Sequence, residues 1–304
     1  MASFIKIDKI AKKVNNTNLL ANFSFGVEKD EVLFILGKSG SGKSTLFKIL
    51  MGIVTRDKGN IFIDGMNYDK RKDEIYSIIG YLPQENIFDN ELNILENLYF
   101  YGQLKGMDLS LLKKESFRWA DIFDFKKYLY MMPNQISSDY LRKISIARAC
   151  LSKPKVLLLD NPTLGMNLSD IKLTWEVINE FKKDKAILCI NQNFQEAEFY
   201  ADRVIIIHNG EVAINSSIDN INNSINATYR YQFIFKRIVP HEFLKLIKTN
   251  AKIKNMISRD KYFEFSTNQK SVFFEIFKIA LNYELIDFKF NSSKLNEIYL
   301  KVTE

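Results

Sequence analysis

The chain is poor in cysteine and histidine, the residues that crosslink small secreted proteins or bind metals: its 304 residues include two of each. Cys150 and Cys189 lie in different apolar segments without metal-ligand spacing, so we expect reduced core residues of a cytosolic protein rather than a disulfide. No run of about 18 apolar residues occurs, which argues against a membrane-spanning helix. The charged start, MASFIKIDKIAKK, lacks the apolar core of a signal peptide.

Positive charge is in excess but unevenly spread. The chain has 43 Lys/Arg against 36 Asp/Glu, a net charge of +7. Residues 228–304 contain 14 basic and 8 acidic residues, a net of +6, which leaves only +1 for the first 227 residues. The excess lies away from the motifs that follow, so we expect no nucleic-acid partner, and a solvated basic face is the plainer interpretation.

The pattern of apolar residues predicts an α/β protein with a second, smaller domain. Strand-like runs alternate with helical patterns over residues 1–215, which favours a layered α/β domain. Within it, residues 86–150 are mostly helical in pattern, and Asn93 followed by Glu96 is typical of a helix N-terminus with a capping box. The polar, aperiodic segment 216–227 is predicted to be a linker.

Residues 228–304 have an alternation of their own. Strand-like YRYQFIFK is followed by helical PHEFLKLI, a hairpin around Arg259-Asp260, helical SVFFEIFKIAL, strand-like ELIDFKF and a last helix, SKLNEIYLKV. The order β-α-β-β-α-β predicts a small α+β accessory domain of the split βαβ type.

Between residues 37 and 44, GKSGSGKS fits the pattern G-x-x-x-x-G-K-[ST] and follows the apolar strand EVLFIL. Glycines let backbone N–H groups approach a phosphate closely, and Lys43 brings a cation to the β- and γ-phosphate oxygens. Ser44 offers a hydroxyl to Mg²⁺, and the helix that begins near Thr45 points its positive end at the anion. A Gly/Ser loop without a ligand is the alternative, which the strand-then-helix context disfavours. The predicted ATP-binding residues are Gly37, Lys38, Ser39, Gly40, Ser41, Gly42, Lys43, Ser44 and Thr45.

A second candidate metal ligand lies in the segment LLLDNPT at residues 157–163, where an apolar run ends in an aspartate. Asp160 follows the predicted strand Val156–Leu159 and is expected to contact the same Mg²⁺ as Ser44. A strand-terminal aspartate could instead only cap a helix, although the nearby phosphate loop favours the metal role. Asn161 follows it, and an amide cannot accept a proton from an attacking water.

These motifs resemble the ATP-binding subunits of ABC transporters over residues 3 to about 215. The resemblance rests on the phosphate loop, IGYLPQEN (79–86), SIARAC (145–150), LLLDNPT and EAEFYADRVIIIHNGEVA (196–213). It implies a P-loop ABC-type nucleotide-binding domain with a helical subdomain at about 86–150, and it makes Gln84 a further Mg²⁺ ligand. The C-terminal part looks like the extension of drug-exporter ATPases such as daunorubicin-resistance subunits.

The chain departs from the family pattern at the positions that drive hydrolysis. Asn161 replaces the glutamate, Gln192 replaces the switch histidine, and Asn167 replaces a loop aspartate. The signature L-S-G-G-Q becomes ISSDY, which keeps Ser137 but puts Ser138 and Asp139 in place of glycines. Val14 stands where the family has an aromatic residue that stacks on adenine. The resemblance therefore implies a catalytically degenerate subunit, with Asn161 and Gln192 as lost catalytic positions.

The resemblance also implies partners and a place in the cell. Such subunits are cytoplasmic, pair with a second ATP-binding subunit, and dock peripherally on the inner face of the membrane through an integral permease. The aromatic stretch Phe88–Tyr101 is a candidate for that docking, with core packing of the helical subdomain an equal alternative.

We expect a subunit of an exporter that binds ATP and Mg²⁺, hydrolyses ATP weakly or not at all, and gates or assembles the transporter. One alternative is an active ABC ATPase that powers export. Another is a non-transport ABC protein acting on nucleic acid or ribosomes, although such proteins usually carry tandem domains or long coiled-coil insertions, which this chain lacks.

Overall fold

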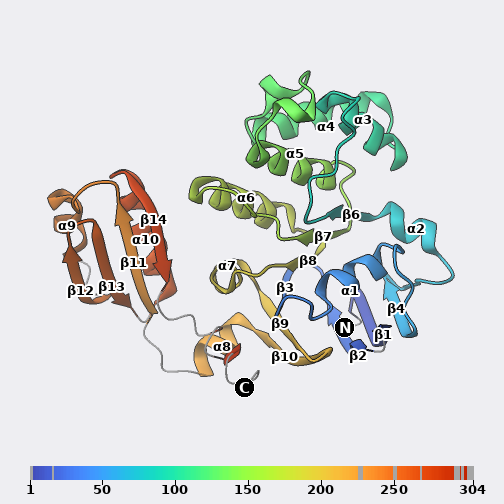
Figure 1. The fold of residues 1–304 in the computed structure, drawn as a ribbon, viewed down its shortest axis with the longest axis horizontal. Helices are drawn as coiled ribbons and strands as arrows, with labels where there is room; N and C mark the ends of the chain where they lie inside the picture. The colour runs from blue at the N-terminus through green and yellow to red at the C-terminus, as the bar shows by residue number, and fades with distance from the viewer. Residues whose placement is uncertain are drawn as a thin grey trace. The chain divides into compact units, whose positions relative to one another are not determined.

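The computed structural model describes residues 3–15, 17–224, 229–248, 252–267 and 269–290, together with Leu295, Ile298 and Tyr299. The chain divides into two compact units, Met1–Ser216 and Ser217–Glu304 (Figure 1). No helix among the described residues is both long enough and apolar enough to cross a bilayer.

A six-stranded sheet in the order β10-β9-β3-β8-β7-β6 forms the centre of the first unit (Figure 1). Its strands are β3 (Glu31–Gly37), β6 (Ile79–Leu82), β7 (Val156–Asp160), β8 (Ala186–Ile190), β9 (Arg203–His208) and β10 (Glu211–Ser217). From β9 to β6 all neighbours run parallel. Every residue of β7 and β8 is buried, which explains their continuous apolar sequences. Because parallel strands end at one edge, the loops after β3, β6, β7 and β8 meet there.

An antiparallel sheet in the order β2-β1-β4-β5 completes the layers of this unit. Its strands are β1 (Ile5–Val14), β2 (Thr17–Val27), β4 (Lys58–Ile63) and β5 (Met66–Asn67). Helix α1 (Lys43–Leu50) buries Leu46, Phe47 and Leu50 in one apolar core together with residues of both sheets. The short helix α2 (Lys72–Ser77) adds Ile75 to the same core. The loop that precedes α1 is therefore fixed at both of its ends by packing.

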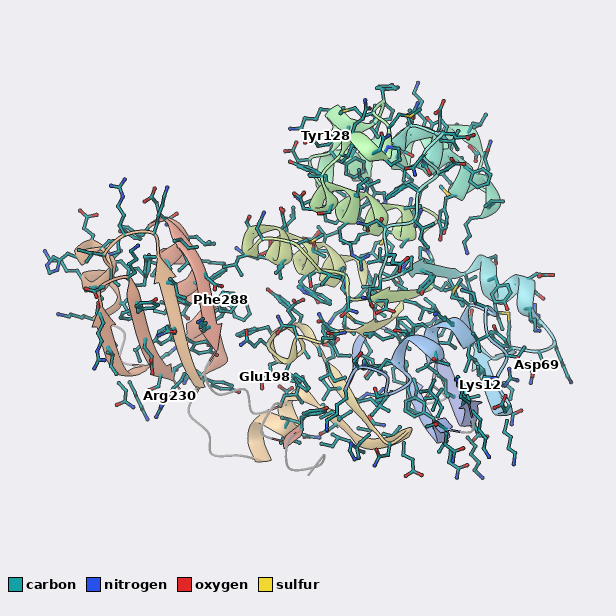
Figure 2. The ribbon with its side chains drawn as sticks, viewed as in Figure 1. Lys12, Asp69, Tyr128, Glu198, Arg230 and Phe288 are labelled. Atoms are coloured by element: carbon teal, nitrogen blue, oxygen red, sulfur yellow. The ribbon has the colours of Figure 1, made fainter. Side chains whose placement is uncertain are left out.

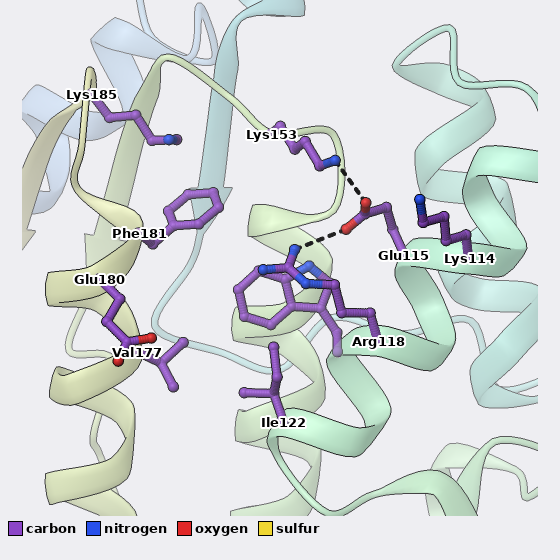
Figure 3. A pocket seen from close by; sticks show the side chains of 10 residues that line it. Lys114, Glu115, Arg118, Ile122, Lys153, Val177, Glu180, Phe181 and Lys185 are labelled. Atoms are coloured by element: carbon purple, nitrogen blue, oxygen red, sulfur yellow. Dashed lines mark hydrogen bonds and ion pairs between the residues drawn. The ribbon is translucent and has the colours of Figure 1, made fainter.

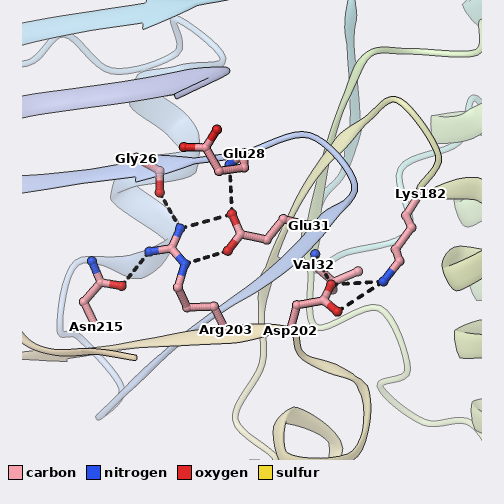
Figure 4. A network of polar contacts seen from close by, with 8 residues as sticks. All are labelled: Gly26, Glu28, Glu31, Val32, Lys182, Asp202, Arg203 and Asn215. Carbon is pink, nitrogen blue, oxygen red and sulfur yellow. Dashed lines mark hydrogen bonds and ion pairs between the residues drawn. The ribbon is translucent and has the colours of Figure 1, made fainter. Parts of the chain in front are cut away.

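Arg203 of β9 ties the two sheets together through a polar network (Figure 4). Its guanidinium donates to both carboxylate oxygens of Glu31 in β3, to the carbonyl of Gly26 in β2 and to the side chain of Asn215 in β10. Charge-assisted bonds from one planar group to three strands restrict how these strands can slide. The network lies at the opposite end of β3 from the phosphate loop.

The helical region predicted at about 86–150 begins at Ile94, and residues 86–93 form no helix. Its helices are α3 (Ile94–Leu104), α4 (Leu109–Ile122) and α5 (Ser138–Cys150), with short 3₁₀ turns at Lys126–Tyr128 and Pro133–Gln135. The predicted capping box at the start of α3 is confirmed, since Asn93 accepts from the Glu96 backbone and Glu96 accepts from that of Asn93. Cys150 in α5 and Cys189 in β8 are buried and free, as the sequence predicts.

The linker predicted at 216–227 is wrong for most of its length. Ser217 still belongs to β10, and residues Ile218–Ser224 form helix α8. Ile218 and Ile221, one helical turn apart, are almost fully buried. Two apolar residues among asparagines and serines give too weak a period to be seen in the sequence, but their burial stabilises a turn of helix.

The second unit has the predicted order β11-α9-β12-β13-α10-β14. Its elements are β11 (Tyr229–Phe235), α9 (His241–Lys248), β12 (Ile253–Arg259), β13 (Tyr262–Thr267), α10 (Lys270–Leu281) and β14 (Leu285–Phe290). The sheet order β12-β13-β11-β14 is antiparallel throughout. Aromatic rings fill the space between sheet and helices: Phe288, marked in Figure 2, lies 5.3 Å from Phe273 and 5.5 Å from Phe277. The last predicted helix, at 293–302, lies mostly outside the described residues.

Candidate nucleotide-binding site

The phosphate loop joins the end of β3 to the start of α1, as the sequence predicts. Gly37, Gly40 and Gly42 have φ angles of 152°, 79° and 97°, which residues with a side chain rarely adopt. A Cβ on Gly37 would lie 2.6 Å from the Ile207 carbonyl oxygen, and one on Gly42 would lie 2.7 Å from that of Leu19. Gly40 faces open space instead. Two glycines thus let the loop fit against its neighbours, and the third leaves room for a ligand.

Lys43 lies inside the loop. Its ammonium donates to the carbonyl oxygens of Gly37 and Lys38, each at 2.7 Å, and to the Ser41 hydroxyl at 3.2 Å. The residue is only 5% exposed, and burial lowers the pKa of Lys43 although Asp160 acts in the opposite direction. The loop therefore holds a partly desolvated cation in a fixed position, which suits a phosphate group.

The proposed metal ligands meet at the ends of β3, β6 and β7. The Ser44 hydroxyl donates to the buried Asp160 carboxylate, whose pKa is raised by burial. The Asn161 amide donates to Asp160 at 3.0 Å and to the Gln84 side-chain oxygen at 3.4 Å. Hydroxyl, carboxylate and amide oxygens are the ligands that Mg²⁺ prefers, so these residues fit the metal that the sequence predicts.

A pocket of about 170 Å³ brings the candidate residues together. It is lined by Leu19, Ser39, Gly40, Gly42, Lys43, Ser44, Thr45, Gln84, Asn161, Ile190 and Gln192. A neighbouring hollow beside the β9–β10 turn shares Ser39 and Gly40 with this pocket and is also lined by Lys38 and Ser41. Asp160 is buried behind Asn161 rather than part of the pocket lining. Asn161 and Gln192 therefore face the space next to the phosphate loop.

Asn161 has an unusual backbone conformation. Its φ of 49° lies in the left-handed region, and its N–H donates to the Ile190 carbonyl at 2.8 Å. Asparagine tolerates this region better than most residues with a side chain. The position is thus fixed both by the neighbouring strand β8 and by the local backbone.

The signature-like residues are not part of the pocket lining. Ser137 is the N-cap residue of α5, and Ser138 and Asp139 begin the helix. The Ser137 hydroxyl donates to Asp139 and lowers the pKa of that carboxyl. A charged carboxylate at a helix N-terminus is stabilised by the helix dipole, so Asp139 repels an anion where backbone N–H groups alone would attract one. Tyr140, which follows, packs against Tyr128 (labelled in Figure 2) with ring centroids 4.6 Å apart.

Arg142 is a structural residue of the site that the sequence did not single out. It is 2% exposed. Its guanidinium donates to five backbone carbonyls, those of Pro83, Gln84, Asp160, Asn161 and Pro162, at 2.5–3.1 Å. One side chain thereby links α5 to the two segments that carry Gln84 and Asp160. No pattern in the sequence around Arg142 indicates these partners.

Glu196 is a second residue that sequence reasoning missed. Its carboxylate accepts from Thr163 at 2.7 Å, Trp175 at 2.8 Å, Asn191 at 3.1 Å and Asn193 at 3.3 Å. Burial raises its pKa, while the four donors act to lower it. Glu196 lies in α7 (Phe194–Tyr200), so it braces the segment after Asn161 against the segment that carries Gln192.

Comparisons with known proteins identify related sequences. The sequence model of the family described as ABC transporter matches residues 20–164. ABC transporter A family member 11 of Dictyostelium discoideum is 26% identical over 91% of this chain and 34% of its own length. ATP-binding cassette sub-family A member 17 of Mus musculus is 29% identical over 71% of this chain and 12% of its own length. The chain thus spans between about an eighth and a third of these two relatives.

Two solved structures have the same fold. A structure described as the ATP binding subunit of an ABC transporter matches with a TM-score of 0.69 and 25% identity, over 73% of this chain and 93% of that one. The dimeric bacterial ABC transporter cassette MJ0796 matches with a TM-score of 0.63 and 24% identity, over 70% and 98%, which supports the fold alone.

A parallel sheet with a glycine-rich loop around a buried lysine, next to a strand-terminal aspartate, defines a P-loop nucleotide-binding protein. The family match and the A-family relatives narrow the class further. The chain contains the ATP-binding domain of the ABC transporter family, with the predicted α/β fold.

Proposed function

We propose that the chain is a cytoplasmic ATP-binding subunit of an ABC exporter that binds Mg-ATP, hydrolyses it weakly or not at all, and gates or assembles the transporter. The observation that carries the proposal is the contrast within one pocket. Lys43, Ser44 and Gln84 line the pocket with groups that would hold phosphate and metal, while Asn161 and Gln192 line it at the two positions that would drive cleavage.

The residues that would bind the nucleotide are those of the phosphate loop and three residues that offer oxygen ligands to the metal. Lys43 and the loop backbone would hold the β- and γ-phosphates, and Ser44, Gln84 and Asp160 would hold the metal. When bound, Mg²⁺ would supply positive charge that neutralises part of the charge of the phosphates. Val14, 45% exposed at the end of β1, offers no aromatic face to a base, so we expect affinity to come mainly from the phosphates.

Loss of the general base is the main reason to expect slow hydrolysis. The Asn161 side chain can hold a water by hydrogen bonds but cannot take its proton, and general-base help is worth about 10²–10⁴ in rate. Its amide already donates to Asp160 and Gln84, so it is oriented by the metal ligands. Gln192 can donate an N–H but carries no positive charge.

The signature-like segment supports the same conclusion for a paired site. Asp139 is the acidic residue of the first turn of α5. A carboxylate roughly 5 Å from a phosphate charge costs about 3 kcal/mol at an effective dielectric near 20. Two copies of this chain would therefore form weak sites with each other. We propose a second ATP-binding subunit as partner, in a homo- or heterodimer, and the cassette MJ0796 with the same fold is itself described as dimeric.

A permease subunit is the other proposed partner. Exposed apolar side chains gather in the helical region, namely Ile87, Phe100, Leu104, Tyr130 and Met132. Ile94 and Leu98 of the same stretch are buried. One side of Phe88–Tyr101 therefore packs in the core of the helical region, and the other side is free to bind a permease. Attachment of this surface to an integral permease would hold the chain peripherally at the inner face of the membrane.

Nucleotide binding and phosphate release measured on the same preparation test the proposal. Lys43→Ala removes the buried cation, and hydrogen bonds to charged groups are worth about 1.5–3 kcal/mol. That corresponds to roughly a ten- to hundredfold loss of Mg-ATP affinity. Lys48→Ala is the matched control, because it removes a lysine from the exposed side of the same helix, α1, and Lys48 is not part of the pocket lining.

Two results would refute different parts of the proposed function. Wild-type affinity in Lys43→Ala would show that the site is assigned wrongly. Normal affinity with a turnover in the ordinary range of about 1–10³ per second, in the chain alone or with its partners, would leave the site intact and refute the claim of weak hydrolysis. The chain would then be an active ATPase that powers export.

A further inference from the structure

A separate cavity of about 610 Å³ lies in the first unit between α4 and α6 (Leu168–Phe181) (Figure 3). Its lining residues are Lys114, Glu115, Arg118, Trp119, Ile122, Lys153, Val177, Glu180, Phe181 and Lys185. None of them belongs to the lining of the nucleotide pocket. The volume falls in the range of about 300–1,000 Å³ typical of small-molecule sites.

Aromatic and aliphatic side chains form the inner wall of this cavity. Trp119 is 1% exposed, and its ring lies 5.8 Å from that of Phe181 and 5.9 Å from that of Phe123. Val177 from α6 and Ile122 from α4 complete the apolar surface (Figure 3). Flat rings next to branched aliphatic groups suit an aromatic or alkyl body.

The rim is positively charged. Four cations and two carboxylates line the cavity, a net of +2. Glu115 is already neutralised, since it accepts from Arg118 at 3.0 Å and from Lys153 at 2.7 Å. Among the described residues, neither Lys114 nor Lys185 forms an ion pair with a carboxylate, and the Lys185 ammonium lies 4.5 Å above the Phe181 ring. The rim therefore retains cations that an incoming anion can use.

The Trp119 indole is a second sign of a missing ligand. Its N–H is buried and, within the described part of the chain, has no hydrogen-bond partner. Buried indole N–H groups are usually bonded, because leaving one unsatisfied costs free energy. The guanidinium of Arg118 lies 5.5 Å above this ring, and about half of the Arg118 side chain is exposed. Movement of Arg118 toward an anion would open the N–H to an acceptor atom.

We propose that this cavity binds a small organic anion, with its aromatic or alkyl body against Trp119 and Phe181 and its acidic group among the rim cations. Such a ligand would connect α4 of the helical region with α6, which begins seven residues after Asn161. The site does not depend on the proposed function, because it shares no residue with the nucleotide pocket.

Fluorescence titration of the full chain with 8-anilinonaphthalene-1-sulfonate tests this site, in the presence of Mg-ATP so that the nucleotide pocket is covered. We expect saturable binding of one probe per chain and quenching of tryptophan emission. The uncharged analogue N-phenyl-1-naphthylamine has the same body without the sulfonate and should bind at least tenfold more weakly. Equal binding of the two would mean an apolar crevice without anion recognition and would refute the proposal.

Three variants locate the probe. Val177→Phe narrows the cavity and should reduce affinity more than tenfold, and Lys185→Gln removes a rim cation and should reduce it about threefold to fivefold. Lys183→Gln is the matched control, an exposed lysine two residues away that is not part of the lining, and should bind like wild type. If circular dichroism shows that Val177→Phe is misfolded, the probe affinities of Lys185→Gln and Lys183→Gln decide whether the probe binds in this cavity. Equal affinities in that pair would overturn the assignment.

Discussion

Arg142 offers the sharpest test of how the site is held together. We predict that Arg142→Met lowers the free energy of unfolding of the first unit by about 4 kcal/mol. The side chain makes five bonds to buried carbonyls, and bonds from charged donors are worth about 1.5 kcal/mol or more each. Removal of a buried charge returns part of that loss. Burial lowers the Arg142 pKa to about 10 against the opposing attraction of Asp160, a net cost to the charged form of about 3 kcal/mol.

Arg142→Lys provides a graded comparison. It keeps the charge, but an ammonium at one point can reach only one or two of the five carbonyls, so we expect a loss of roughly 2 kcal/mol. Arg148→Met is the control on the same helix, because Arg148 donates to a single carbonyl, that of Ile87. It should cost about 1 kcal/mol, because one bond from a charged donor is lost and removal of a buried charge returns part of that loss.

Urea titration followed by tryptophan fluorescence measures these differences. The chain has only two tryptophans, Trp119 and Trp175, and both lie in the first unit, so the signal reports on that unit. An Arg142→Met variant within about 1 kcal/mol of wild type, or equal to Arg148→Met, would refute the idea that this guanidinium links the Gln84 and Asp160 segments. We also expect weaker Mg-ATP binding in Arg142→Met, since both segments supply metal ligands.

Three further predictions concern hydrolysis, pH and the second unit. Asn161→Glu in the isolated chain should still release phosphate far more slowly than the triple variant that adds Gln192→His and Asp139→Gly; equal rates would mean that Asn161 alone prevents hydrolysis. Glu196→Gln places an amide among four donors and should cost about 1–3 kcal/mol in urea titrations. Because the folded-state pKa of Glu196 is raised, the wild-type free energy of unfolding falls as pH rises above about 4.5. The cost of Glu196→Gln should therefore be larger at pH 5 than at pH 8. The opposite trend would contradict the assignment. Residues 228–304, with their net charge of +6, should make the chain co-sediment with anionic but not neutral liposomes at low salt, each base adding about 1 kcal/mol; equal sedimentation with both lipids would exclude charge as the cause.

The features that the sequence predicted are local in the chain. The phosphate loop needs eight consecutive residues, and the capping box needs Asn93 and Glu96 three residues apart, so composition and spacing carry the whole signal. The order of strands and helices in residues 229–290 is likewise visible in the spacing of apolar residues within each short segment. Each of these features can be predicted without knowing which segments meet in space.

The features that were missed depend on distant partners. Arg142 bonds to carbonyls at residues 83 and 84, almost sixty positions away, and no property of the surrounding helix indicates them. Helix α8 depends on the burial of Ile218 and Ile221, which the polar segment does not suggest. Glu196 looks like an ordinary surface residue until Trp175 and Thr163 are folded against it. Tertiary contacts, rather than propensity, decide all three.

The left-handed backbone of Asn161 has a consequence for any substitution at this position. A glutamate at φ 49° would carry a conformational penalty of about 1–2 kcal/mol, which asparagine largely avoids. An engineered carboxylate would therefore pull the backbone away from the geometry that holds the Asn161 N–H against the Ile190 carbonyl. The residue type and the shape of the loop at the end of β7 are in this way coupled, so a change of chemistry here is also a change of backbone.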